Sequence, residues 1–486
     1  MWNPMEVRSF AKSRWAYLRS EGYRYFNRIC ELTEQFWLSR WYFPVLLVLC
    51  AIFLLLDQQV MGVAVLVLVT TGFLALCPDA MAALCPFMML FLLAGPEYDD
   101  LSVFLPCAPL ALPLLLAALL HLALWPQTLR MGRSGYGLAL VSLATIFGGS
   151  GVISQQDYFQ PMSLYYMFGL GAGLLVLYVL FRSHLARERS YNVYERFMAI
   201  CYTMGLAAVA LVLSQYAHNF EEFLANGGVL NFDCRNFCAT VLLTTLPMPF
   251  YFARKSKVHI AVCVLFEAAL VLTGSRSAVL FGAILTVLCC IYLVRYGVVS
   301  KRDMLIVGVV VVAAAVFFGA DYLANFYGSR LSGSGFWHSG NKTRLRLWAC
   351  GLNDFLHHPL FGIGLGSSAN ASIFTDASGG MTFYHNAVAQ VIGSMGLLGI
   401  VAYGRLVADR VTLLRRERTP FTSAMTLSYL GMLMVSMTNP GVFCPFPNAV
   451  MMVMAFAMVE EATGDVALPL VQLLAIRRYT AARKHN

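Results

Sequence analysis

Long apolar stretches recur along this chain from Trp41 to Ala462, and each is close to the ~20 residues that a membrane-spanning helix needs. Fourteen such segments can be counted, and at ~20 residues each they occupy over half of the chain. Charged residues make up only 12% of the sequence, against about 25% in an ordinary soluble domain. This composition excludes a soluble enzyme, a disordered protein and a nucleic-acid binder, and predicts an all-α, polytopic helical membrane protein.

The hydropathy pattern divides the chain into five parts. We expect a basic N-terminal segment over 1–37, eleven transmembrane helices over 38–320, one long exterior loop over 321–385, three further transmembrane helices over 386–462, and a basic tail over 463–486. The predicted spans are 38–56, 59–77, 80–95, 101–125, 137–155, 163–181, 197–217, 237–253, 260–275, 277–294, 304–320, 386–404, 421–438 and 448–462.

The distribution of positive charge predicts the orientation. Seven Lys and Arg residues lie between Arg8 and Arg40, before or at the start of the first span. If this segment is cytoplasmic, 28 of the 34 Lys and Arg residues lie on the cytoplasmic side, which is a strong positive-inside bias. Both termini are therefore expected in the cytoplasm, with the basic excess facing the anionic lipid bilayer. Six basic residues remain outside: Arg235, Arg276, Arg330, Lys342, Arg344 and Arg346.

The 65-residue exterior loop, residues 321–385, is the main candidate for function. A loop of this length is usually either functional or disordered, and its many aromatic residues argue against disorder. From Thr343 to His357, apolar residues recur at i, i+3 and i+4 spacing, which predicts a short amphipathic helix that ends before Pro359. Such a helix could lie flat on the outer leaflet.

Arg276 lies at the outer membrane boundary, in a minimal turn between the ninth and tenth predicted spans. A positive charge among apolar walls is costly, and it is least costly when it faces an anion. The rigid fork of donors on arginine suits a phosphate group. The alternative is an interfacial arginine whose side chain simply reaches to water.

His385 lies where the long loop re-enters the membrane, and its imidazole can accept a proton at neutral pH. The alternative is a structural residue hydrogen-bonded to a loop carbonyl. His357 and His358 stand at a helix end, where capping is the simpler explanation. No cysteine or histidine spacing indicates a metal site, so we expect no metal and no cofactor.

Two further motifs have mainly structural readings. The run from Gly362 to Gly366 could turn N–H groups toward a phosphate, but it lacks the ending of a P-loop, and turns that need positive φ are the simpler explanation. Glu267 is an acid inside a predicted span, where a packing role is favoured over direct chemistry.

The energy source limits the reaction class. Chemistry on the outer face cannot draw on cytoplasmic nucleotide sugars or ATP, so the donor must arrive activated and already across the membrane. Arginines at the lipid boundary match a diphosphate headgroup on a polyprenyl chain, and the aromatic loop suits the faces of sugars. These features favour glycan transfer from a lipid diphosphate.

Several motifs between about 260 and 405 also resemble one family. They are Thr273-Gly274-Ser275-Arg276, Arg344-Leu-Arg-Leu-Trp348, His358-Pro359-Leu-Phe-Gly362-Ile-Gly364-Leu-Gly366, and His385-Asn386 followed by Gly396. In this order and spacing they resemble the O-antigen ligase and O-antigen polymerase family of bacterial surface-polysaccharide enzymes. The first 250 residues are similar to that family only in being a hydrophobic helix bundle.

The resemblance implies an inverting, metal-independent glycosyltransferase in the cytoplasmic (inner) membrane that uses an undecaprenyl diphosphate-linked glycan and a glycan or glycolipid acceptor. It implies that Arg276 and Arg344 hold the diphosphate and that His385 is the base. Thr343 stands where family members often have glycine, so Arg346 is the alternative to Arg344. The remaining candidates for substrate binding are Arg346, Arg235, Trp348 and Lys342.

Two other functions compete with this one. A flippase or exporter of lipid-linked oligosaccharides would suit fourteen spans, although the chain has one dominant exterior loop and no internal repeat. A glycan polymerase of the rod-shape and division type would instead use an exterior carboxylate such as Asp354. Ligase and polymerase activities, in the synthesis of lipopolysaccharide or capsule for the cell envelope, are not distinguished by the sequence.

Overall fold

The structure is a computed structural model, and it describes residues 24–97, 101–154, 159, 163–164, 166–225, 230, 232–303, 339–365, 384–439, 441–443 and 446–470. Its elements are the helix Arg24–Leu38, α2 (Tyr42–Leu55), α3 (Gln59–Leu76), α4 (Met81–Leu93), η1 (Gly95–Glu97), η2 (Leu101–Leu110), α5 (Ala111–Leu124), β1 (Arg130–Met131), α6 (Arg133–Phe147), η4 (Tyr166–Gly173), α8 (Leu174–Leu185), α9 (Val193–His218), α10 (Phe220–Ala225), α11 (Arg235–Thr245), α12 (Pro247–Ala253), α13 (Val258–Leu272), α14 (Arg276–Arg295), α16 (Ser339–His357), α17 (Ala387–Arg416), α18 (Pro420–Ser436), α19 (Phe446–Ala462) and β2 (Leu468–Pro469). Within the described residues, strands are limited to the antiparallel pair β1 and β2. The expected all-α class is confirmed.

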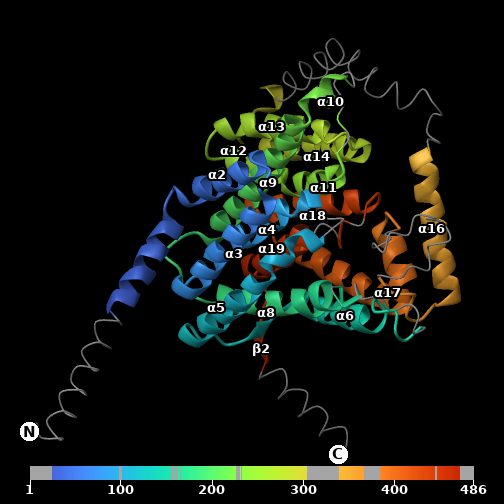
Figure 1. Ribbon diagram of the computed structural model, residues 1–486, viewed down its shortest axis with the longest axis horizontal. Helices are drawn as coiled ribbons and strands as arrows, with labels where there is room; N and C mark the ends of the chain where they lie inside the picture. The colour runs from blue at the N-terminus through green and yellow to red at the C-terminus, as the bar shows by residue number, and fades with distance from the viewer. Residues whose placement is uncertain are drawn as a thin grey trace, which may run out of the picture.

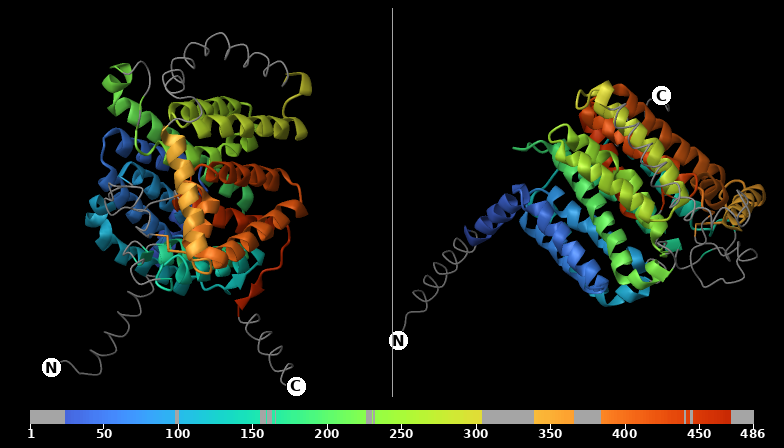
Figure 2. Two further views of the ribbon diagram at one scale, coloured as in Figure 1. Left: turned by 90° about the vertical axis from the view of Figure 1, so that its right-hand side faces the viewer. Right: turned by 90° about the horizontal axis from the view of Figure 1, so that it is seen from above.

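The helices form one bundle around α19 (Figure 1). In that view α6 and α8 lie along one side of the bundle, and α13 and α14 lie along the other. Helix α16 stands at one edge of the bundle in Figure 1 and in the right view of Figure 2, and it packs against α17. The helix Arg24–Leu38 leaves the bundle at an angle of 82° to α2.

The central helix α19 is buried all round, from Pro447 to Glu460. A helix without a polar face belongs in the core of a bundle. The C-terminal end of α19 is held by polar contacts of the Glu460 carboxylate. This carboxylate accepts hydrogen bonds from the Tyr178 hydroxyl at 2.6 Å and from the Ser134 backbone N–H at 2.5 Å. Arg182 pairs with the same carboxylate at 3.2 Å. A buried charge network therefore ties α19 to α6 and α8.

Helix α17 is broken at Gly396, which has φ 60° and ψ −149°. The segment that follows α16, Pro359–Leu365, crosses this break. The N–H groups of Leu397 and Leu398 donate to the carbonyls of Pro359 (2.8 Å) and Leu360 (3.2 Å). In return, the segment donates two N–H groups to carbonyls of α17, and the Leu365 N–H donates at 2.7 Å to the carbonyl of Gly149, just after α6. The break thus joins α16, α17 and α6.

The structure does not confirm fourteen spans. Seven helices are long and apolar enough to cross a membrane, or eight if the bent pair that includes α2 is one span, counted over the described residues. Part of the difference is length, since α4 has 13 residues and α13 has 15. The predicted span 101–125 is one of the seven, as Ser102–Leu124, although it begins as a 3₁₀ helix that contains Pro106 and Pro109. The predicted span 304–320 lies outside the described residues.

Helix α17 is longer than predicted, because it continues to Arg416 rather than ending at residue 404. Two charged residues of this extension, Asp409 and Arg410, are buried inside the protein. Asp409 is only 2% exposed, and its carboxylate accepts a hydrogen bond from Arg405 Nε at 2.8 Å. The same carboxylate lies 3.9 Å from Arg133 Nη1. Hydropathy alone underestimates the length of a helix that carries buried charged residues.

The crossing at Gly396 predicts a position-specific effect of a single methyl group. A Cβ at Gly396 would lie 2.6 Å from the Pro359 carbonyl oxygen in a left-handed backbone conformation, whereas a Cβ at Gly404 meets nothing within 4 Å. We expect Gly396→Ala to destabilise the purified protein by about 2–4 kcal/mol and Gly404→Ala to be neutral or slightly stabilising. Thermal unfolding in detergent measures both, and equal melting temperatures would contradict this role of the break.

Candidate active site at the start of α17

Two helix N-termini carry Arg235 and Arg276. Arg235 is the first residue of α11 and Arg276 the first residue of α14. Ser275, the N-cap of α14, donates a hydrogen bond from Oγ to Asn236 Oδ1 at 3.2 Å, which joins the two N-termini. Because the free N–H groups of a helix start give it a partial positive charge, the two arginines add to an already positive potential.

Arg344, from α16, is brought to the same place. Its side chain is largely desolvated, and this burial lowers the pKa of its guanidinium. The positive charges of Arg276 and Arg235 lower the pKa of Arg344 further, in that order. Three arginines that repel one another around one site favour an anion as the occupant.

His385 stands just before α17 in a left-handed conformation, with φ 52°. Its two neighbours fix the backbone. Tyr384 donates its hydroxyl to Asp354 at 2.5 Å and its N–H to Gln390 Oε1 at 3.0 Å. Asn386 caps α17 by accepting hydrogen bonds from two backbone N–H groups. Such strain persists only where the surroundings over-determine it, and it is common at functional sites.

The imidazole of His385 lies within the electrostatic field of Arg344. Burial lowers its pKa, the charge of Arg344 lowers it further, and a hydrogen-bonding contact with Asn439 raises it. The net direction is downward, so the ring is neutral and able to accept a proton at neutral pH. His385 and Arg344, 41 positions apart in sequence, are therefore electrostatic neighbours.

The other predicted residues are placed as follows. Trp348 lies one helical turn after Arg344 on α16, half-buried, and its indole N–H is buried without a hydrogen-bond partner in the described part of the chain. Arg346 is exposed. The side chain of Lys342 and all of Arg330 lie outside the described residues. The structure thus brings Arg235, Arg276, Arg344 and His385 together, with Trp348 beside them.

Asp354, the alternative base, is engaged by the Tyr384 hydroxyl, and burial raises the pKa of its carboxyl. The glycine run is also engaged. Gly362 and Gly364 have φ 67° and 92°, and the Gly364 N–H donates to the Ser394 carbonyl at 2.9 Å. These N–H groups are used by the protein backbone, so the turn interpretation is confirmed for the described glycines. Glu267 accepts a hydrogen bond from Thr286, consistent with its packing role.

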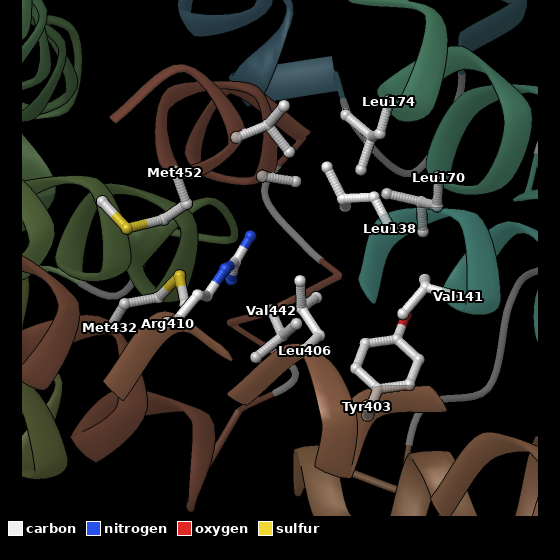
Figure 3. Close-up of a pocket in the computed structure, with 12 residues that line it drawn as sticks. Leu138, Val141, Leu170, Leu174, Tyr403, Leu406, Arg410, Met432, Val442 and Met452 are labelled. Carbon is white, nitrogen blue, oxygen red and sulfur yellow. The ribbon is translucent and has the colours of Figure 1, made fainter. Parts of the chain in front are cut away.

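Sequence reasoning missed two polar residues. Asn439, beside His385, carried one weak signal, a polar Asn-Pro pair after a predicted span. Arg410 is 4% exposed and lies over the rings of Phe456 (4.6 Å) and Tyr429 (5.6 Å). Its guanidinium points into a small, mainly apolar cavity between α6, η4 and α17–α19 (Figure 3). None of the predicted site residues lines this cavity.

The structure therefore defines a helical membrane protein in which several arginines and one histidine meet where α11, α14 and α17 begin. Residues 261–404 match the family model described as O-antigen ligase, which confirms the resemblance found between about 260 and 405. No curated protein matches the chain. The matched region contains Arg276, Arg344 and His385, whereas Arg235 and Asn439 lie outside it. Among the described residues, no group of three or more His, Cys, Asp or Glu side chains could hold a metal ion.

Mutual repulsion among the arginines predicts opposite effects on stability and on binding. Arg276→Gln should leave the ligand-free protein as stable as the wild type, or more stable by about 1 kcal/mol, because a repulsive charge is removed. The same change should weaken binding of inorganic pyrophosphate roughly 10- to 100-fold, since a hydrogen bond to a charged group contributes about 1.5–3 kcal/mol. Thermal unfolding with and without pyrophosphate measures both effects.

Arg346→Gln is the matched control, because Arg346 is on the same helix as Arg344 but exposed. Arg346→Gln should change neither the stability of the ligand-free protein nor its binding of pyrophosphate appreciably. If the two variants lose pyrophosphate stabilisation equally, the binding reflects general surface charge and the arginine site is wrong.

Proposed function

We propose that this protein is a membrane glycosyltransferase of the O-antigen ligase or polymerase type. It transfers a glycan from undecaprenyl diphosphate to the hydroxyl of an acceptor sugar, at the outer face of the cytoplasmic membrane and with both termini in the cytoplasm. The observation that carries this proposal is the position of a neutral, strained His385 beside a desolvated Arg344 that shares its surroundings with Arg276 and Arg235.

The chemistry needs a base and a site for a departing anion. The acceptor oxygen forms a bond to the anomeric carbon of the donor as the bond from that carbon to the diphosphate oxygen breaks. Attack from the face opposite the diphosphate inverts the anomeric configuration. The acceptor proton goes to His385, and the bonding electron pair leaves with the diphosphate. Positive charge therefore develops on His385, and negative charge develops on the departing diphosphate.

The arginines supply the second requirement. Guanidinium groups form bidentate, charge-assisted hydrogen bonds to phosphate oxygens, and in desolvated surroundings these bonds are stronger than in water. Arg235, Arg276 and Arg344 together balance the charge of a diphosphate without a metal ion in the proposed reaction. Trp348 offers an aromatic face to a sugar, and Arg346 and Lys342 lie on the same helix.

The alternative, a flippase or exporter, also requires a site for the diphosphate. A proton acceptor beside that site is required for glycosyl transfer, whereas an exporter needs one only if its transport is coupled to protons. The juxtaposition of His385 and Arg344 therefore favours transfer over transport.

Reconstitution tests the reaction and separates its two forms. Purified protein in proteoliposomes is given an undecaprenyl diphosphate-linked glycan with a candidate acceptor glycolipid. A ladder of products would identify a polymerase, and a single new glycoconjugate would identify a ligase. Movement of the intact donor across the bilayer with no glycosidic product would contradict the proposal and support the exporter.

The role of His385 predicts a large loss of rate when its basic nitrogen is removed. His385→Gln keeps hydrogen-bonding groups but cannot take up a proton near neutral pH. Transfer should fall by about 10²–10⁴-fold, while pyrophosphate binding is retained because the arginines are intact. His357→Gln is the matched control, since His357 is an exposed histidine at the end of α16. A His385→Gln variant with near wild-type transfer would exclude His385 as the base.

The pH dependence follows from the lowered pKa of His385. The base acts in its neutral form, so activity is lost as the pH falls through the histidine pKa. Because that pKa is depressed, the acid limb of the wild-type rate profile should lie below the usual histidine value of about 6.5. An acid limb clearly above this value would contradict the assignment.

A further inference from the structure

The imidazole of His385 has one buried nitrogen that the protein must satisfy. Nδ1 is inaccessible and makes no hydrogen bond of good geometry within the described residues. A neutral imidazole carries its proton on one ring nitrogen and accepts on the other, so the partner of Nδ1 decides which nitrogen faces the acceptor sugar. A base whose tautomer is not fixed spends part of its time with the wrong nitrogen protonated.

Asn439 is placed to be that partner. It lies in the turn after α18, its side chain is 4% exposed, and its backbone N–H donates to the Val435 carbonyl at 2.9 Å. The same turn is fastened to the start of α17, because Asn386 Nδ2 donates to the Met437 carbonyl at 3.0 Å. The Asn439 amide nitrogen is buried and, like His385 Nδ1, has no partner of good geometry among the described residues. His385 and Asn439 are neighbours, because Asn386 fastens the start of α17 to this turn and a side-chain contact with Asn439 raises the pKa of His385.

We propose that Asn439 is a positioning residue for the base: its amide oxygen accepts a hydrogen bond from Nδ1–H of His385, which leaves Nε2 unprotonated toward the acceptor hydroxyl. This inference rests on the proposed role of His385. It adds a residue from the turn after α18 to a site otherwise built from α11, α14, α16 and the start of α17.

A neutral amide suits this position better than a carboxylate. The charged group that acts on the imidazole is Arg344 of α16, which itself lies in the field of Arg276 of α14 and Arg235 of α11. The charge of Arg344 disfavours an imidazolium before the reaction begins. A carboxylate at position 439 would offset this charge and favour the protonated ring, whereas an amide oxygen fixes the tautomer without adding charge.

The test compares Asn439→Asp and Asn439→Leu with the neighbouring control Thr438→Val. Thr438 lies in the same turn, and its hydroxyl donates only to the local carbonyl of Val435. The first readout is the rate at which diethyl pyrocarbonate modifies His385 across pH, followed by mass spectrometry of the His385 peptide. This reagent attacks the neutral ring, so the rate reports the pKa of His385 without any need for activity. The exposed His357 in the same digest is the internal reference.

We expect Asn439→Asp to move the midpoint of His385 modification upward by about one pH unit or more, with no movement for Thr438→Val or at His357. In the reconstituted reaction, Asn439→Leu should lower kcat at least about tenfold with little change in the donor KM, because the arginines still hold the diphosphate. The acid limb of Asn439→Asp should move upward with its modification midpoint.

The outcomes separate the two proposals. An unchanged modification midpoint in Asn439→Asp, or a kcat for Asn439→Leu equal to that of Thr438→Val, overturns the positioning role even if the wild type transfers glycan. A shifted midpoint in a protein that transfers no glycan supports the contact between Asn439 and His385 but overturns the proposed function.

Discussion

The exchange of backbone hydrogen bonds at the break in α17 holds the candidate site together. At Gly396 the helical backbone hydrogen bonds of α17 are interrupted, and the segment after α16 supplies the hydrogen-bond partners instead. Only glycine tolerates this backbone conformation with neighbouring carbonyls so close. The exchange fixes α16, which carries Arg344, against α17, which begins beside His385. Without it, side-chain contacts such as the hydrogen bond from Tyr384 to Asp354 would have to set the register of the two helices.

The backbone exchange at Gly396 stabilises the fold, whereas the arginine cluster destabilises it when no ligand is bound. Desolvation and repulsion by Arg276 and Arg235 disfavour the charged form of Arg344, so the cluster weakens the ligand-free fold slightly. The buried charges near α19 differ, since Arg182 is matched by Glu460 and Glu461. Mutually repelling charges at one place and paired charges at the other distinguish a candidate anion site from a structural network.

The sequence predicted the parts that depend on local pattern. Apolar periodicity indicated the helical class and the amphipathic α16, and the positions of Arg276 and His385 at span ends marked them as unusual. It could not predict contacts made across the bundle. Arg410 was placed in a loop because nothing in its window reveals the rings of Phe456 and Tyr429, and Asn439 meets His385 only after α17 and α18 pack. The distinction between Arg344 and Arg346 likewise needed three-dimensional burial, because both fit the same motif.

The central claim is that a diphosphate is held by the arginines next to His385. A cryo-electron microscopy structure of the protein in nanodiscs with bound undecaprenyl diphosphate tests it most directly. The account predicts phosphate density within hydrogen-bonding distance, about 2.7–3.2 Å, of guanidinium nitrogens of Arg235, Arg276 and Arg344, with the His385 ring at the edge of the site. A headgroup bound elsewhere, for example at Arg410 or along the C-terminal ends of α8 and α19, would contradict it.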